Sequence, residues 1–243
     1  MALSVGLNPR GARLLTCEWD TKQVRRRYDE MAGNWRLLGI IDWLLLVKRL
    51  RKKHFAGAGG DVLDVACGTG ENLEFLGRAK TITAFDLSTE MVEETRRRIG
   101  QIGEEVALLA GDAQQMPFPD DRFDTVISAF SSCTFPDNAA AFREMVRVTR
   151  PGGRILLLEH GRSSVGLIAR RQDRNIERVC ERSACRNNRD VRAELAEAGL
   201  EPASHLKSHL GMMNRITIAV GPANASRGRA GGDTRFDSGP SDR

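Results

Sequence analysis

Two aspartates and a glycine turn form the part of this chain that could bind a ligand. Asp64 lies in an apolar run that ends at a turn containing Gly68 and Gly70, and Asp86 ends the next apolar run. The first run is typical of a buried parallel strand, and glycines let the backbone turn tightly and approach a ligand closely. Asp86 follows the turn at close to the spacing of about 20 residues at which a carboxylate binds ribose hydroxyls beside a nucleotide site. The pattern therefore predicts a nucleotide-type ligand at a strand–loop–helix junction.

Strand and helix patterns alternate around these residues. Strand patterns lie near residues 62–66, 81–86, 106–110, 123–128 and 154–159, and helix patterns near 72–79, 89–99, 138–148 and 190–198. Such alternation predicts a parallel sheet with helices on both faces. Two more strand patterns, near 204–210 and 215–220, are joined by a few residues around Gly211, which favours an antiparallel hairpin. The predicted fold class is α/β: a doubly wound, Rossmann-like sheet of seven strands, mostly parallel, with a C-terminal antiparallel hairpin.

The size and composition suit one sizeable globular domain. The chain has 243 residues with a hydrophobic content of 41%, which is ordinary for such a domain. No apolar run reaches the roughly 18 residues needed to span a bilayer, and the run 37–47 contains Asp42, which suits a buried or interfacial helix. We divide the chain into an N-terminal extension (1–21), an N-terminal helical lid (22–58), a ligand-binding domain (59–221) and a disordered tail (222–243) rich in Gly, Ser, Arg and Asp.

The positive charge is concentrated in two segments, 22–53 and 162–192. A general nucleic-acid binder more often has a continuous basic face with interleaved aromatics, and aromatics are 5% here, so we expect no specific nucleic-acid partner. In the second segment Arg170, Arg174 and Arg178 share one helical face, roughly opposite Ile168, Ile176 and Val179. This pattern is typical of peripheral contact with an anionic membrane, and equally of a solvated charged face over a buried one.

The cysteines and acids give weaker indications. The five cysteines form neither an even disulfide set nor a Cys-x-x-Cys knuckle, which favours free thiols in a reducing compartment and a cytoplasmic location. Arg10 and Arg13, with no acid in residues 1–17, leave organellar targeting open. No cluster of acids marks a metal site, so we predict none, and a magnesium-assisted mechanism is disfavoured.

Five motifs in order resemble the class I S-adenosylmethionine-dependent methyltransferases, in the branch that includes quinone-biosynthesis enzymes. The resemblance covers roughly residues 24–220, and its motifs are residues 63–70, 85–91, 111–118, 123–126 and 147–153. It implies S-adenosylmethionine as cofactor, a small-molecule methyl acceptor and direct in-line transfer of the methyl group.

The resemblance also implies roles for individual residues. Asp64 would orient the methionine amino group, largely through water, and Asp86 would accept hydrogen bonds from both ribose hydroxyls. The backbone of Ala66, Gly68 and Gly70 would pass close to the methionine part. The other implied contacts are Leu87 and Met91 on the adenine faces, Asp112 and Ala113 at the adenine amino group, and Ser128 on the floor near the sulfonium. For Met91, a role as ordinary core stays open.

A narrower resemblance concerns the acceptor side. Residues 132–137 and 158–163, together with Cys185, Asn188 and Arg189, are similar to a subgroup of bacterial phospholipid N-methyltransferases, mammalian membrane-associated thiol methyltransferases and a mitochondrial methyltransferase-like group. It implies a lipophilic acceptor: a phospholipid, a quinone or a thiol. The chain departs from the family at 34–35, which read Asn-Trp where a second Tyr-Asp often follows Tyr28-Asp29.

Two residues are candidates for a catalytic role. Because the sulfonium is already a strong electrophile, the protein must mainly hold nucleophile, methyl carbon and sulfur in line, with reacting atoms about 3 Å apart. His160 follows the fifth strand on the side where ligands bind in open α/β sheets, and could act as a base if the nucleophile must lose a proton. A structural role for His160 stays open. Tyr28 could close over the cofactor or pack in the core.

Three other functions share parts of this pattern. A nucleic-acid methyltransferase is disfavoured because residues 128–131 lack the Asp/Asn-Pro-Pro-aromatic box, and Cys133 lacks the preceding proline of cytosine-C5 enzymes. A dehydrogenase is disfavoured because Leu73 stands where the fingerprint has its third glycine. A non-catalytic S-adenosylmethionine-binding or assembly protein would share the whole cofactor pattern, and binding without turnover would distinguish it.

Overall fold

The computed structural model describes residues 2–7, 13–33, 41–102 and 105–221. Its elements in chain order are β1 (Ala2–Leu7), β2 (Arg13–Glu18), α1 (Thr21–Ala32), α2 (Ile41–Phe55), β3 (Gly59–Val65), a short 3-10 helix (Leu73–Phe75), β4 (Arg78–Asp86), α3 (Thr89–Ile102), β5 (Val106–Ala110), β6 (Phe123–Ala129), α4 (Asn138–Val148), β7 (Thr149–His160), α5 (Gly166–Ser183), α6 (Val191–Glu197), β8 (Ser204–Ser208) and β9 (Met213–Ala219). The predicted tail at 222–243 lies outside the described residues.

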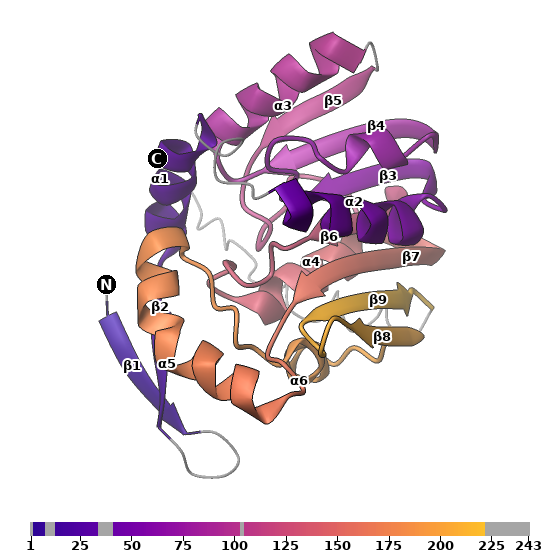
Figure 1. Cartoon of the computed structure of the whole chain (residues 1–243). Helices are drawn as coiled ribbons and strands as arrows, with labels where there is room; N and C mark the ends of the chain where they lie inside the picture. The colour runs from indigo at the N-terminus through magenta and orange to yellow at the C-terminus, as the bar shows by residue number, and fades with distance from the viewer. Residues whose placement is uncertain (1, 8–12, 34–40, 103–104, 222–243) are drawn as a thin grey trace, which may run out of the picture.

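Seven strands form one sheet in the order β5-β4-β3-β6-β7-β9-β8. Strands β5, β4, β3, β6 and β7 are parallel neighbours, whereas β9 pairs antiparallel with both β7 and β8. The predicted fold class is therefore confirmed. The strand order reverses beside β3, and ligands of such sheets bind at the carboxyl ends next to this reversal. In Figure 1, α1 and α5 stand on the left, over that end of the sheet.

The sheet is buried on both faces. Leu63 and Val65 of β3 share one core with Phe142 of α4, whereas Val62 belongs to a second core with Phe55 of α2. Because successive strand residues point to opposite faces, β3 is packed from both sides. Figure 1 shows α2 in front of the sheet and α4 behind it. This packing gives the loop after β3 a rigid base.

Two predicted boundaries are wrong. The helix predicted at 72–79 is only the 3-10 helix Leu73–Phe75, because Arg78 and Ala79 pair with Gly59 and Gly60 as the start of β4. The last parallel strand begins at Thr149 instead of 154, directly after α4. Its early part is bonded to the residue after β9, because the Val220 N–H donates to Gly153 O at 3.0 Å. Of the predicted helix 37–47, the part before Ile41 lies outside the described residues.

The prediction that all the cysteines are free is also wrong. Cys67, Cys133 and Cys185 are free thiols, but Cys180, fully buried in α5, is disulfide-bonded. An odd cysteine count therefore does not exclude a disulfide. Within the described ranges, no helix is long and apolar enough to cross a bilayer.

Candidate functional site

A cavity of about 680 Å³ lies at the carboxyl ends of the parallel strands. Five strand ends contribute to its wall: Ala66 follows β3, Asp86 ends β4, Gly111 follows β5, Ala129 ends β6 and His160 ends β7. Residues of α1 and α2 close it from above, and much of this cover is apolar, with Val24, Met31 and Val47. The cavity therefore has two titratable side chains, Asp86 and His160, among its strand ends and a partly apolar roof.

The glycine turn is held in a backbone conformation that leaves room in the cavity. Gly68 has φ +57°, in the left-handed region, and a Cβ built on it would meet no atom within 4 Å. Since Gly68 lines the cavity, that Cβ would occupy ligand space. Helix α3 supports the turn from outside: Thr95 Oγ1 donates to Gly68 O at 2.7 Å, and Arg98 Nε donates to Thr69 O at 2.7 Å.

Asp86 is tied to the same turn. Its Oδ2 accepts the Gly68 N–H at 2.8 Å and its Oδ1 accepts the Ser88 N–H at 2.9 Å. Burial raises the pKa of Asp86 to about 6. Ser88 links this point to α1 as well, because its Oγ donates to Asp29 Oδ1 at 2.6 Å and accepts the Met91 N–H at 3.1 Å, capping α3.

Asp64 lies behind the cavity wall and is completely buried. Its Oδ1 accepts a hydrogen bond from Asn72 Nδ2 at 2.8 Å, while Oδ2 has no partner among the described residues. Burial raises the pKa of Asp64 to about 7. Asn72 in turn accepts a hydrogen bond from Arg51 of α2, which also pairs with Glu71 at 2.9 Å. A chain of polar contacts thus joins the α2 cover to the end of β3.

Asp112 lies at the other end of the cavity. Its Oδ1 accepts the Gln114 N–H at 2.9 Å, and its Oδ2 accepts Thr21 Oγ1 at 3.2 Å, at the start of α1. The neighbouring Ala113 and the side chain of Met91 are buried and also line the cavity, as does Leu87. This end is the apolar slot in which an aromatic base would fit, with the Asp112 carboxylate at its edge.

His160 and Tyr28 lie on the side away from Asp112. The His160 ring stacks on Phe130, with centroids 6.0 Å apart, and its Nε2 lies 3.3 Å from Cys185 Sγ. The Tyr28 hydroxyl donates to Ser183 O at 3.2 Å, and burial raises the pKa of Tyr28 well above its ordinary value. Tyr28 therefore stays protonated at neutral pH and connects α1 to the end of α5.

Most of the predicted site residues line this cavity: Tyr28, Ala66, Gly68, Asp86, Leu87, Met91, Asp112, Ala113 and His160. Asp64, Gly70 and Ser128 do not. Gly70 is packed against α3, and Ser128 Oγ donates to Val65 O at 2.7 Å behind the wall, where Ser131 lines the cavity instead. The individual ligand roles stay predictions.

Sequence reasoning missed Arg51, Asn72, Phe130 and Cys185 as lining residues. Asn72 could have been found, because it follows the glycine turn directly. Arg51 could not have been found, because it lies in a run of basic residues and the sequence does not show which of them points toward the sheet.

Comparison with known proteins finds methyltransferases among the similar proteins. Residues 63–157 match the family model described as a methyltransferase domain. The structure of a Bacillus halodurans protein assigned as a methyltransferase has a TM-score of 0.56 and 28% identity, over 65% of this chain and 70% of that one.

Two relatives extend the likeness beyond the matched domain. "Methyltransferase OMS1, mitochondrial" of Saccharomyces cerevisiae is 29% identical over 204 residues, which are 76% of this chain and 43% of that protein. Phosphatidylethanolamine N-methyltransferase of Cereibacter sphaeroides is 33% identical over 124 residues, 50% of this chain and 61% of that protein. The chain thus spans less than two thirds of the length of either relative.

The residues around the cavity fit S-adenosylmethionine, the cofactor that the sequence resemblance implies, which carries a sulfonium, an amino group, a ribose and an adenine. The open space at Gly68 admits its chain, and Asp64, buried behind the wall with Oδ2 partnerless among the described residues, would reach its amino group through water. Two buried carboxyl groups with raised pKa values suit a cationic ligand, because positive charge stabilises their ionised forms.

Proposed function

We propose that this chain transfers the methyl group of S-adenosylmethionine to a lipophilic small molecule. The observation that carries the proposal is that the glycine turn, Asp86, His160 and an apolar roof all line the same cavity. When bound, the donor supplies an electrophilic methyl carbon. The protein then has to hold the acceptor in line with that carbon and exclude water, which can supply on the order of 7–11 kcal/mol of the barrier.

On the donor side, we assign the ribose hydroxyls to Asp86 and the adenine to the slot between Leu87, Met91 and Asp112. We place the methionine end next to the wall in front of Asp64 and the polar contacts around it. We add Arg51 to this set, because it is half-buried beside Asn72 and stacks its guanidinium over the Phe130 ring at 5.3 Å. We assign the donor carboxylate to Arg51, since guanidinium groups bind carboxylates in two-bond geometry.

On the acceptor side, the apolar walls support a lipophilic molecule. Val24, Met31 and Val47 come from the cover, and Phe130 and Phe135 from the loop after β6. These side chains exclude water from the reacting atoms and offer burial to an apolar tail. The similarity to phosphatidylethanolamine N-methyltransferase supports this substrate class. We assign His160 to the wall of the acceptor site, where the metal-free imidazole would take a proton from an acceptor that must lose one, and Tyr28 to the cover of the donor.

We also propose peripheral contact with an anionic membrane. Arg170, Arg174 and Arg178 are exposed on α5, and Leu167 of the same helix is 67% exposed. Leu210, 56% exposed, lies close to the start of this helix, because its carbonyl accepts the Ser164 N–H at 2.9 Å. Exposed leucines beside arginines suit an interfacial helix. Sedimentation of the full chain with acidic vesicles would detect the contact; no binding at moderate salt would contradict it. The cytoplasmic and organellar locations stay predictions.

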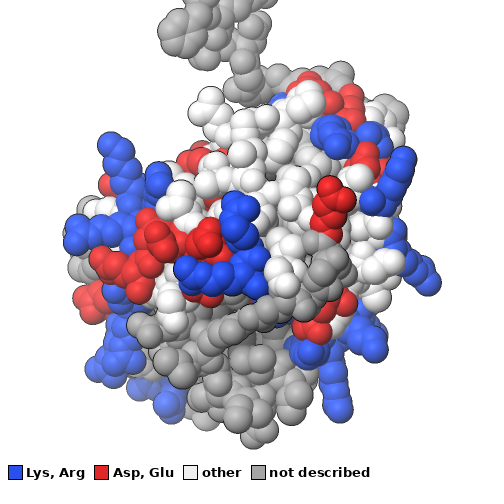
Figure 2. All heavy atoms as spheres, turned by 90° about the horizontal axis from the view of Figure 1, so that it is seen from above, with Lys and Arg blue, Asp and Glu red and all other residues white. Residues whose placement is uncertain are grey.

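The rival functions are supported less well. On the face shown in Figure 2, Lys and Arg side chains are interspersed with Asp and Glu. Helix α3 is one example, where Arg96 pairs with Glu93 at 3.1 Å and Arg97 pairs with Glu94. Nucleic acids bind to continuous basic surfaces, so this face does not suit them. The remaining alternative is a non-catalytic S-adenosylmethionine-binding protein, which an assay of methyl transfer distinguishes from an enzyme.

The proposal is tested with donor labelled on its methyl group. The full chain is incubated with labelled S-adenosylmethionine and with lipid, quinone or thiol extracts, and the label is followed into the organic phase. We expect incorporation into one extract, abolished by Asp86→Ala. Donor binding by calorimetry without incorporation into any extract would support the non-catalytic alternative, and absence of donor binding would overturn the proposal.

A further inference from the structure

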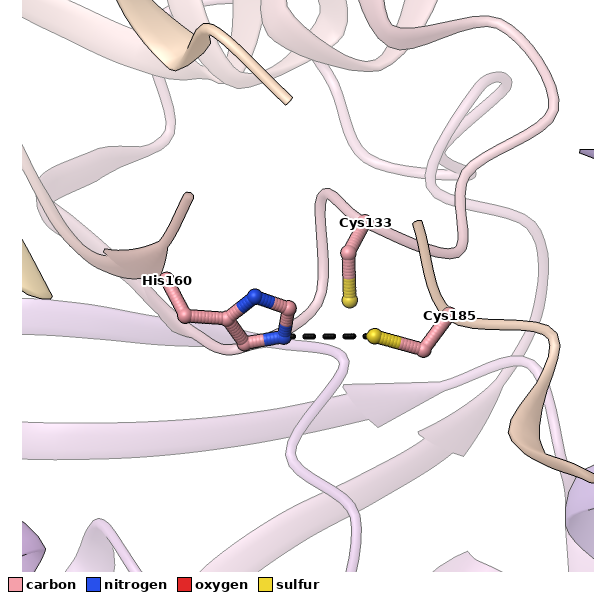
Figure 3. Close-up of side chains that lie close together, drawn as sticks. All are labelled: Cys133, His160 and Cys185. Carbon is pink, nitrogen blue, oxygen red and sulfur yellow. Dashed lines mark hydrogen bonds between the residues drawn. The ribbon is translucent and has the colours of Figure 1, made fainter. Parts of the chain in front are cut away.

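Three soft metal-ligand side chains meet in the wall of the cavity. The donor atoms of Cys133, His160 and Cys185 all lie within 4.8 Å of one another, and His160 Nε2 is 3.3 Å from Cys185 Sγ. Figure 3 shows the two thiols and the imidazole pointing toward a common centre. The sequence reasoning predicted no metal, because it looked for acids and for closely spaced cysteines.

The three side chains come from separate parts of the fold. Cys133 lies in the loop after β6, His160 ends β7, and Cys185 follows the left-handed residue Ala184 at the end of α5. Contacts that do not involve these three side chains hold the segments together. The N–H of Arg186 donates to Cys133 O at 3.1 Å, and its Nε donates to the same oxygen at 3.3 Å. Stacking on Phe130 orients the imidazole.

The two cysteines are free thiols in largely buried positions. Cys133 is 1% exposed and free, and Cys185 is free and half-buried. The side chains of Arg186 and Arg189 lie near both cysteines, and Arg189 is itself buried. The group is therefore a preorganised pair of thiols with one imidazole.

We propose that Cys133 Sγ, Cys185 Sγ and His160 Nε2 bind one Zn²⁺ ion, with a fourth position open toward the cavity. Two thiolates and one neutral imidazole form a common zinc ligand set, and three protein ligands with one open position distinguish reactive zinc sites from closed structural ones. Binding replaces two thiol protons, which are released to solvent, so the zinc–dithiolate unit is neutral. All three ligands line the cavity, so the open position faces the acceptor side.

The site makes a specific spectroscopic prediction. The full chain, purified with a phosphine reductant and stripped with a chelator, is titrated with Zn²⁺ against a chromophoric chelator and with Co²⁺ in an absorption cell. We expect one Zn²⁺ per chain, and a Co²⁺ complex with thiolate-to-cobalt charge-transfer bands and tetrahedral d–d bands. Each of Cys133→Ser, Cys185→Ser and His160→Gln should weaken Zn²⁺ binding at least about 100-fold.

Cys67→Ser is the matched control, because Cys67 is a buried free thiol lining the same cavity outside the group. It should bind Zn²⁺ and Co²⁺ as the wild type does, and circular dichroism establishes which variants fold. Absence of thiolate-to-cobalt bands in the reduced wild type would overturn the proposal without any variant. So would Zn²⁺ binding that survives in Cys133→Ser/Cys185→Ser. If the reduced chain binds no Zn²⁺, and Cys133 and Cys185 form a disulfide with each other in air, the two thiols are a redox pair and the zinc proposal is wrong.

Discussion

Asn72 donates from its amide nitrogen to the buried carboxylate of Asp64 at 2.8 Å. The other end of the same amide accepts a hydrogen bond from Arg51 on the α2 cover. One side chain therefore couples the end of β3 to the helix that closes the cavity. We expect Asn72→Leu to weaken S-adenosylmethionine binding about tenfold, since a hydrogen bond to a charged group is worth roughly 1.5–3 kcal/mol. Calorimetry measures the change, and Asn175→Leu on the exposed side of α5 is the control.

Donor binding should depend on pH. Burial raises the pKa of Asp64 to about 7 and that of Asp86 to about 6, and a cationic donor favours their ionised forms. Affinity should therefore rise between pH 5 and about 8, with proton release on binding that calorimetry in two buffers detects. Asp64→Asn should remove the upper part of the rise. An affinity that is flat over this range would contradict the assignment of the carboxylates.

The free protein should show the opposite trend in stability. A carboxyl group whose pKa is higher in the folded state binds more protons there than in the unfolded chain, so folding is favoured at low pH and loses this contribution as the pH rises. For Asp64 the window runs from its ordinary value near 4 up to about 7. We expect the melting temperature to fall across this window relative to that of Asp64→Asn. Parallel melting curves for the two proteins would contradict the prediction.

Arg51 should act on the donor carboxylate. Arg51→Ala should raise KM for S-adenosylmethionine about tenfold or more, because a charged hydrogen-bonding partner is lost. Arg51→Lys should recover only part of the loss, because lysine cannot form the planar two-bond contact. Lys52→Ala, an exposed neighbour on the same helix, serves as control and should leave KM unchanged. Equal effects at positions 51 and 52 would point to general electrostatics instead.

Substitutions at two glycines should affect donor affinity and folding stability differently. Gly68→Ala adds a methyl group in open cavity space at φ +57°, so we expect a stability loss of about 1 kcal/mol and a much larger loss of donor affinity. Gly153→Ala places its Cβ 2.8 Å from Asp124 O and 2.9 Å from Arg150 O, so it should destabilise the fold by about 2 kcal/mol. Urea unfolding and calorimetry on both variants check the pair. Unchanged donor affinity in Gly68→Ala would contradict the placement of the donor at the turn.

Ser88 should stabilise the junction of α1 and α3. It caps α3 through the Met91 N–H and donates to Asp29 of α1. Ser88→Ala should lower the free energy of unfolding by about 1–2 kcal/mol, as the loss of a helix N-cap does. Ser204→Ala, at an exposed position in β8, should leave it within about 0.5 kcal/mol. Urea titration of both variants gives the comparison, and equal midpoints would show that the cap contributes nothing.

Local patterns were enough to determine the fold class and many of the residues that line the cavity. The apolar run before Gly68, the carboxylate of Asp86 and the alternation of strands and helices are properties of short segments, and short-range sterics and burial act within them. The parallel sheet, the C-terminal hairpin and the cavity lining at Gly68 and Asp86 followed from these segments. The helix predicted at 72–79 failed because strand pairing of Arg78 with Gly59 outweighed the local preference.

Only the tertiary structure decided which distant side chains meet. Arg51 joins Asn72 and Asp64 because α2 packs on one face of the sheet, and nothing in the basic run around it marks that residue. Cys133, His160 and Cys185 lie on three segments whose convergence depends on the order of β6 and β7 and on where α5 ends. The spacing of residues in a sequence predicts which side chains are neighbours along one helix or strand. It does not predict which side chains of separate loops meet, because long-range packing decides that.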